Sequence, residues 1–151
     1  MKTRAKVIIT IVAVLALAAL AGCGTPKIDV LNPGEYDNPP GDEWADALPI
    51  YMAWDGAGGE SWEYEFSAEG VVEEGGAPAP PESEDGIVLE EYDPPGGRTV
   101  WFYGVSPGDV TITFTTENSN GKVVDIQQYA VRVNDEMQLA LLHQQNDNFR
   151  N

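Results

Sequence analysis

The chain has 151 residues, which is enough for one domain with additional segments. It carries 25 Asp and Glu against eight Lys and Arg, so its formal net charge is −17. A negative field of this size repels nucleic acid, and the composition therefore excludes a nucleic-acid partner.

The first residues have the pattern of a secretory signal. Three basic residues in "MKTRAK" precede an uncharged apolar run from Val7 to Leu20. This run is short for a transmembrane helix but suits the apolar region of a signal peptide. It leads into "LAGC", Leu20 to Cys23, which resembles the bacterial lipobox, where cleavage precedes a cysteine that becomes lipidated. We therefore expect residues 1–22 to be a lipoprotein signal peptide and Cys23 to be the lipidated residue.

A lipid at Cys23 has consequences for the rest of the chain. Cys23 is the only cysteine, so the mature protein would have no disulfide and its fold would depend on core packing. The signal contains three basic and no acidic residues, so the mature formal charge is +5 − 25 = −20. The lipid would hold the protein at the cell membrane or outer membrane, on the extracytoplasmic side. Residues 23–45 are rich in proline and glycine without sustained periodicity, which predicts a flexible tether.

Residues 46–134 alternate between apolar and polar positions in short runs separated by turn-forming residues. The runs, in chain order, are "LPIYMAW", "WEYEF", "IVLEEY", "RTVWFYGV", "VTITFTT" and "YAVRV". Pro49 marks the first run as an edge strand, whereas the fourth is apolar on both faces and is expected in the middle of a sheet. Short strands at close spacing, without a convincing long helix, predict an all-β, Ig-like antiparallel β-sandwich.

Two segments depart from the strand pattern. Residues 67–86 are acidic and rich in Pro, Gly and Ala, which predicts a long disordered loop. Asn134 or Asp135 can cap a helix that begins in "EMQLALLHQ". We therefore expect residues 135–151 to form a short C-terminal helix or a disordered tail.

The residue types that carry most enzymatic chemistry are scarce. His143 is the only histidine, and no serine near it has the sequence surroundings of a nucleophile. The chain therefore lacks the residues for a Ser-His-Asp arrangement or a zinc site. Glu63 and Glu65 share an outward strand face and are interpreted as solvated rather than as a glycosidase pair. Neither "SEDG" nor "EEYD" has the ligand spacing of an EF-hand loop. We expect no enzymatic activity, no metal and no cofactor.

The stretch "DGAGGESW", Asp55 to Trp62, resembles a loop of the chagasin-type inhibitors of papain-like cysteine proteases. That family has an Ig-like sandwich with three loops at one end, and its first loop reads N-P-T-T-G-Y-x-W. Asp55 stands for the Asn, while Gly59 and Trp62 match the Gly and Trp. The family's second signature, a Gly-Gly pair that opens an aromatic strand, is similar to "PPGGRTVWFYGV" at Gly96 and Gly97.

The third loop departs from the family. An Arg-Pro-aromatic sequence is expected after the Thr-rich strand, and that position holds Asn118, Ser119 and Asn120. In the family the loops form a wedge that enters the protease cleft. The resemblance assigns partner contact to Asp55, Gly56, Ala57, Gly58, Gly59, Gly96, Gly97, Asn118, Ser119 and Asn120.

Together these observations predict a membrane-anchored, extracytoplasmic lipoprotein that binds a protein. The resemblance implies weak, reversible inhibition of a papain-like cysteine protease by occlusion of its cleft. An alternative is an Ig-like lipoprotein for adhesion or envelope assembly without inhibitory activity. A third interpretation is a solute- or glycan-binding lipoprotein that uses the aromatic residues around Trp54 and Trp62.

Overall fold

The computed structural model describes residues 26–53, 59–79 and 96–150. The expected signal peptide, the lipidation site at Cys23, the loop residues 55–58 and the expected strand at residues 87–92 lie outside these ranges. None of the helices in the described ranges is long and apolar enough to cross a membrane.

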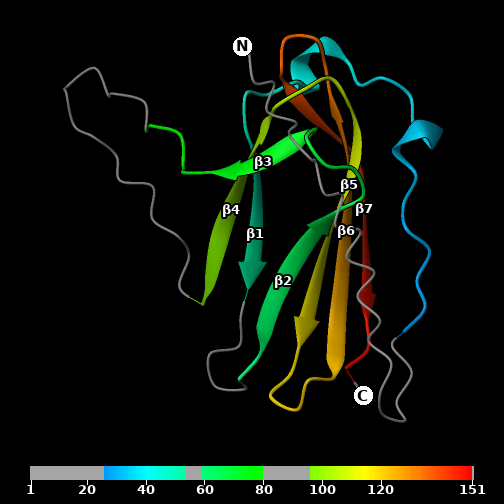
Figure 1. Ribbon diagram of the computed structural model, residues 1–151, viewed down its shortest axis with the longest axis vertical. Helices are drawn as coiled ribbons and strands as arrows, with labels where there is room; N and C mark the ends of the chain where they lie inside the picture. Colours follow the sequence, from blue (N-terminus) through cyan, green and yellow to red (C-terminus); the bar gives the residue numbers. More distant parts are fainter. Residues whose placement is uncertain (1–25, 54–58, 80–95, 151) are drawn as a thin grey trace, which may run out of the picture.

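Two antiparallel sheets pack face to face as a sandwich (Figure 1). The three-stranded sheet has the order β1 (Leu48–Ala53), β4 (Gly97–Gly104), β3 (Val72–Gly75). The four-stranded sheet has the order β2 (Ser61–Phe66), β5 (Gly108–Glu117), β6 (Val123–Val133), β7 (Leu139–Asn148). Two short 3-10 helices, η1 (Pro33–Glu35) and η2 (Gly41–Glu43), precede the strands, and the described residues contain no α-helix. The all-β prediction is confirmed.

The core lies between the sheets and follows the period-two pattern of the sequence. β1 and β4 contribute one side of it, with Phe102 fully buried, and β5 and β6 contribute the other, with Phe114 fully buried. The rings of Phe102 and Phe114 meet edge to face with centroids 6.2 Å apart. Burying a large apolar side chain stabilises a fold by about 1.5–3 kcal/mol, so these facing rows supply the main driving force for folding.

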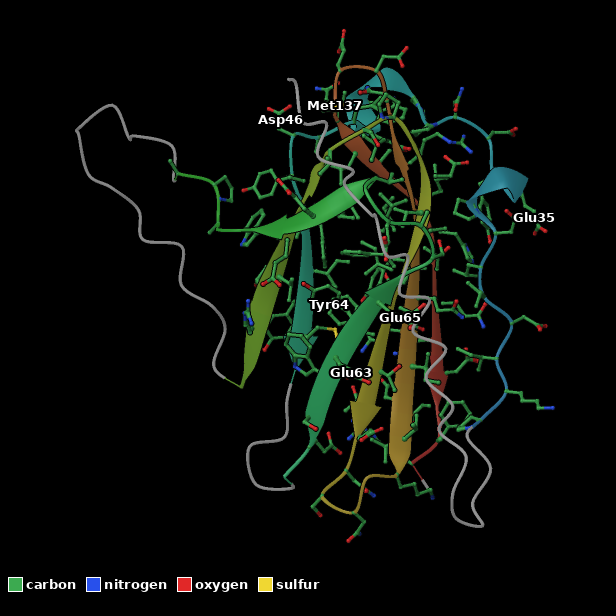
Figure 2. All side chains as sticks on the ribbon, in the orientation of Figure 1. Glu35, Asp46, Glu63, Tyr64, Glu65 and Met137 are labelled. Atoms are coloured by element: carbon green, nitrogen blue, oxygen red, sulfur yellow. The ribbon has the colours of Figure 1, made fainter. Side chains whose placement is uncertain are left out.

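The predicted places of three strands are confirmed. β1 pairs only with β4, so it is the edge strand that Pro49 indicated, and β4 is the middle strand of its sheet. On β2 the apolar side chains pack half-buried against the core, whereas Glu63 and Glu65 are exposed. Figure 2 shows Glu63, Tyr64 and Glu65 in sequence along this strand.

The prediction of a short helix or disordered tail at residues 135–151 is wrong, because Leu139–Asn148 form β7 along the edge of β6. Leu139 is 1% exposed and Ala140 is fully buried, and this burial outweighs the helix propensity of the segment. Asn134 does act as a cap, but of a turn: its side-chain oxygen accepts the backbone N–H groups of Glu136 and Gln138, each at 2.9 Å.

The prediction of a disordered loop over residues 67–86 is wrong for its first half. Val72–Gly75 form β3, which pairs with β4, and the Val72 side chain is buried in the core. The sequence "VEEG" has a single apolar residue, so its membership in a sheet depends on the neighbouring strand rather than on its own pattern.

The prediction of a flexible tether over residues 23–45 is wrong for most of that segment. Residues 29–38, which we call the N-terminal strap, lie on the outer face of the four-stranded sheet (Figure 1). The Thr111 hydroxyl donates to the Leu31 carbonyl at 2.7 Å, and the Gln128 side chain exchanges hydrogen bonds with the strap backbone. Thr111 and Gln128 are fully buried because the strap covers them.

Candidate functional site

The described members of the predicted partner-binding set converge on one end of the sandwich, which we call the loop end. β1 ends and β2 begins there, β5 turns into β6 there, and β4 begins there (Figure 1). The strand register confirms this arrangement, since Ala53 at the end of β1 pairs with Gly97, and Ser61 at the start of β2 pairs with Glu117. Segments that are far apart in the sequence therefore share one surface.

Gly59 brings the first loop against the third. Its φ of 67° lies in the left-handed region, which glycine adopts without strain. A Cβ built at Gly59 would stand 3.2 Å from the Ser119 Cβ, so the two loops are in close approach and a larger residue would push them apart. The remaining first-loop residues, Asp55 to Gly58, lie outside the described ranges.

Asn118 holds the turn between β5 and β6. Its side-chain oxygen accepts the backbone N–H groups of Asn120 and Lys122, each at 3.0 Å. Its backbone N–H donates to the Lys122 carbonyl at 2.9 Å, which closes the turn. Because the Asn118 side chain is engaged within the turn, the side chains offered to solvent at its tip are those of Ser119 and Asn120.

The Gly-Gly pair has a structural reason at each position. Gly96 has a φ of 88°, again in the left-handed region. Gly97 lies beneath the ring of Tyr51 from the neighbouring strand, and a Cβ there would collide with the ring. The pair thus lets the chain turn into β4 while the 40%-exposed Tyr51 covers its first residue.

A polar cluster that sequence reasoning missed lies between the sheets on the side where β2 and β3 are edge strands. Glu74 accepts a hydrogen bond from the Tyr64 hydroxyl and forms an ion pair with Arg98. The Arg98 guanidinium also lies over the Trp62 ring, 6.0 Å from its centroid. Arg98 lies two residues before Val100 on β4, so its side chain is on the same face of the strand, the face toward the core. Glu74 lies in a segment that was predicted to be disordered, so nothing in the sequence indicated an ion pair between Glu74 and Arg98.

This cluster changes the acidity of Tyr64. Burial raises the pKa of Tyr64 to about 12, and both the hydrogen bond to Glu74 and the negative charge of Glu74 act in the same direction. The positive charge of Arg98 opposes them. The neutral phenol is therefore the form that the folded protein stabilises.

The loop end also contains a buried carboxylate that the sequence did not single out. Asp125 lies at the start of β6 and is 6% exposed. Its Oδ2 accepts from the Gln127 side chain at 2.9 Å, whereas its Oδ1 is buried and has no hydrogen-bond partner among the residues that the structure describes. The charge of Asp125 adds to burial in raising the pKa of Tyr129. A buried carboxylate oxygen favours a hydrogen-bond partner, so Asp125 is a polar position beneath the loops.

Among the described residues of this surface, groups suited to catalysis or metal binding do not lie together. Within the described ranges, no three His, Cys, Asp or Glu side chains are placed to hold a metal ion. His143 stacks on Tyr36, with ring centroids 5.0 Å apart, on the outer face of the sheet. An open depression lies at the opposite end of the sandwich and is lined in part by Trp44, Arg132 and Asp135. The described residues of the loop end offer backbone groups, short polar side chains such as Ser119 and Asn120, and the exposed Lys122.

These features define an all-β sandwich that carries a loop surface at one end. Comparison of the chain with family models, with curated proteins and with solved structures gives no match. The residues of the chain and their arrangement therefore carry the functional proposal.

Proposed function

We propose that this chain is a lipid-anchored, extracytoplasmic, Ig-like lipoprotein that binds a protein with its loop end and inhibits a papain-like cysteine protease weakly and reversibly. The observation that supports this proposal is the close approach of Gly59 to Ser119, because it brings the first and third loops into one surface. Three loops at one end of a sandwich are what the resemblance to chagasin-type inhibitors implies. Inhibition would be competitive and non-covalent, through occlusion of the cleft.

The composition of the surface explains why binding would be weak. The third loop exposes Ser119 and Asn120, and neither is a residue type that dominates interface energetics, as Trp, Tyr and Arg do. The first loop contains three glycines, and ordering a flexible residue costs about 1–2 kcal/mol. A wedge built in this way gives up affinity both in contacts and in ordering entropy.

The same third loop favours one alternative. The Arg-Pro-aromatic elements of the family are replaced by a turn whose first residue, Asn118, is occupied by internal hydrogen bonds. A sandwich with such a turn also suits adhesion or envelope assembly without inhibitory activity. The loop end is the binding surface in both proposals, and they differ in the partner.

Inhibition of papain by the mature chain, with Cys23 changed to serine so that it remains in solution, distinguishes the two. We expect weak competitive inhibition, and we expect Ser119→Pro with Asn120→Trp to strengthen it about tenfold, equivalent to about 1.4 kcal/mol. Proline reduces the conformational freedom of the loop and tryptophan adds a typical hot-spot side chain. Asn118 is left unchanged because it holds the turn.

A matched control carries Glu136→Trp in the exposed turn at the opposite end. It should inhibit no better than the parent, while circular dichroism should show the same fold for all three proteins. If neither the parent nor the loop variant affects papain at high micromolar concentration, the inhibitor proposal is rejected and the adhesion or assembly proposal remains.

A further inference from the structure

The N-terminal strap has a defined direction. Asp29 contacts Gln128, Leu31 contacts Thr111, which pairs with Ala130, and Pro33 contacts Arg132. Successive strap residues thus meet successive positions of β6, so the strap runs parallel to β6. Since β6 begins at the loop end, residues 26–28, the first that the structure describes, lead from Asp29 toward the loop end (Figure 1).

The strap places the lipidation site close to that end. At about 3.3 Å per extended residue, Pro26 lies about 10 Å from the level of Lys122 in the β5–β6 turn and about 30 Å from the level of Asp135 in the β6–β7 turn. Cys23 is three residues before Pro26, so it lies within about 11 Å of it by any path. A chain of this length would let a lipid at Cys23 lie at the level of the loop end, and it is too short to reach the level of the opposite end.

The charges of the two ends differ in a way that fits this placement. Outside the signal peptide the chain has 8 − 3 = 5 basic residues, and all but Arg132 lie toward the loop end: Lys27, Arg98, Lys122 and Arg150. At the opposite end Arg132 forms an ion pair with Asp109. The described acidic residues there are Glu35, Asp37, Asp42, Glu43, Asp46, Glu69, Asp109, Asp135 and Glu136. The described acids toward the loop end are Glu60, Glu63, Glu117, Asp125 and Asp147. Among the described residues the opposite end therefore carries the larger excess of negative charge, and an anionic membrane surface repels it more strongly.

We propose that the strap is a membrane-orienting device, which stands the anchored domain with its loop end toward the bilayer and its acidic end away from it. The proposal rests on lipidation of Cys23, which belongs to the proposed function. Its consequence concerns the partner: a loop surface held within a few residues of the lipid can reach only a protein held at the same membrane surface.

The test compares two single-cysteine variants of the acylated full-length protein in vesicles that contain phosphatidylglycerol. Asn120→Cys labels the loop end and Glu136→Cys labels the opposite end. The pair is matched, because each exposed residue lies in a turn and donates its backbone N–H to an asparagine side chain two residues earlier. Each introduced thiol is the only free one, since Cys23, the only natural cysteine, carries the lipid.

A quencher on the lipid headgroups should quench the fluorophore at residue 120 several-fold more than the fluorophore at residue 136. A flexible ten-residue insertion after Gly24 should shrink that difference, because it uncouples the anchor from the strap. Equal or reversed quenching, or a difference that the insertion leaves unchanged, overturns the orienting role. Mass spectrometry of the membrane fraction distinguishes failure of the anchor from failure of the orientation. An unacylated Cys23 contradicts the proposed lipid anchor, whereas an acylated Cys23 without a quenching difference contradicts only the orienting role of the strap.

Discussion

Asn118 and Asn134 show how single side chains shape both ends of the sandwich. Each asparagine accepts the backbone N–H groups of the residues two and four positions later, at 2.9–3.0 Å. Short polar side chains favour turns because they satisfy backbone donors that have no strand partner. At Asn118 this local bonding fixes the part of the loop end that follows β5.

We expect Asn118→Ala to destabilise the fold by about 1–3 kcal/mol, because two side-chain hydrogen bonds of about 0.5–1.5 kcal/mol each are lost. Urea denaturation of the parent and the variant measures the difference. Asn120→Ala is the matched control, since the Asn120 backbone takes part in the turn while its side chain is exposed, and its effect should stay within about 0.5 kcal/mol. Equal midpoints for parent and Asn118→Ala would contradict the role in the turn.

Tyr64 makes stability depend on pH in the alkaline range. Its pKa is raised from 10.0 to about 12 in the folded protein, so folding favours the protonated phenol. The stability that this phenol contributes is present below about pH 10 and is lost as the pH rises toward about 12. In Tyr64→Phe this part of the alkaline loss of stability should be absent, as denaturation midpoints at several alkaline pH values will show. A parent and a variant with the same alkaline profile would contradict the shift.

At the scale of elements, the alternation of the sequence was sufficient for β1, β2, β5 and β6, and the continuous aromatic and β-branched run was sufficient for β4. In the alternating strands one face packs against the core, so apolar residues recur at every second position of the sequence. The edge position of β1 was also predictable, since proline cannot donate to a sheet ladder.

The elements that prediction missed are those whose structure depends on a distant partner. β3 has one core residue, Val72, and β7 has helix-favouring Leu, Ala and Gln, yet each pairs along the edge of a stronger strand. The strap is held by hydrogen bonds from its backbone groups to the side chains of Thr111 and Gln128. Because its own side chains do not make these bonds, its sequence shows no repeating pattern of apolar residues. Local patterns carry no information about such long-range pairing.

The candidate site was predictable to a similar extent. The resemblance to chagasin-type inhibitors implied that the loops converge, and the described residues Gly59 and Ser119 do lie close together. The inward role of Asn118 and the unpaired oxygen of Asp125 were not predictable, because both depend on the exact path of the backbone around them. A residue type can indicate a turn or a strand face, but hydrogen-bond partners become known only from the structure.

A pair of leucines in β7 tests whether this strand is part of the fold. Leu139 is 1% exposed and belongs to the core cluster, whereas Leu141 is 39% exposed. We expect Leu139→Ala to cost about 2–5 kcal/mol and Leu141→Ala to change stability little. Chemical denaturation of both variants measures this, and equal small effects would restore the prediction of a tail that contributes nothing to the core.

At the scale of the whole molecule, the acidic charge is distributed unevenly around a core without disulfides. Cys23 is the only cysteine, so repulsion among carboxylates acts on a fold that packing and hydrogen bonds alone hold together. At the acidic end the Arg132 side chain offsets part of this repulsion. Its guanidinium bonds Asp109 at 2.6 and 2.9 Å, and it also donates to the Pro33 carbonyl of the strap.

Salt should therefore stabilise this protein. The chain carries a formal charge of −17, and raising the ionic strength from 0.01 to 0.1 M shortens the screening length from about 30 to about 10 Å, which weakens repulsion between carboxylates. The exposed ion pairs weaken as well, but such pairs contribute only about 0–1 kcal/mol each. We expect the thermal midpoint to rise with sodium chloride, by about 4 °C for each 1 kcal/mol gained.

Changing Asp135→Asn and Glu136→Gln together should raise the midpoint at low salt and reduce the gain from added salt, because it removes two charges from the acidic end. A midpoint that falls with salt would show that attraction between opposite charges, rather than repulsion among the acids, dominates the electrostatics of the folded state.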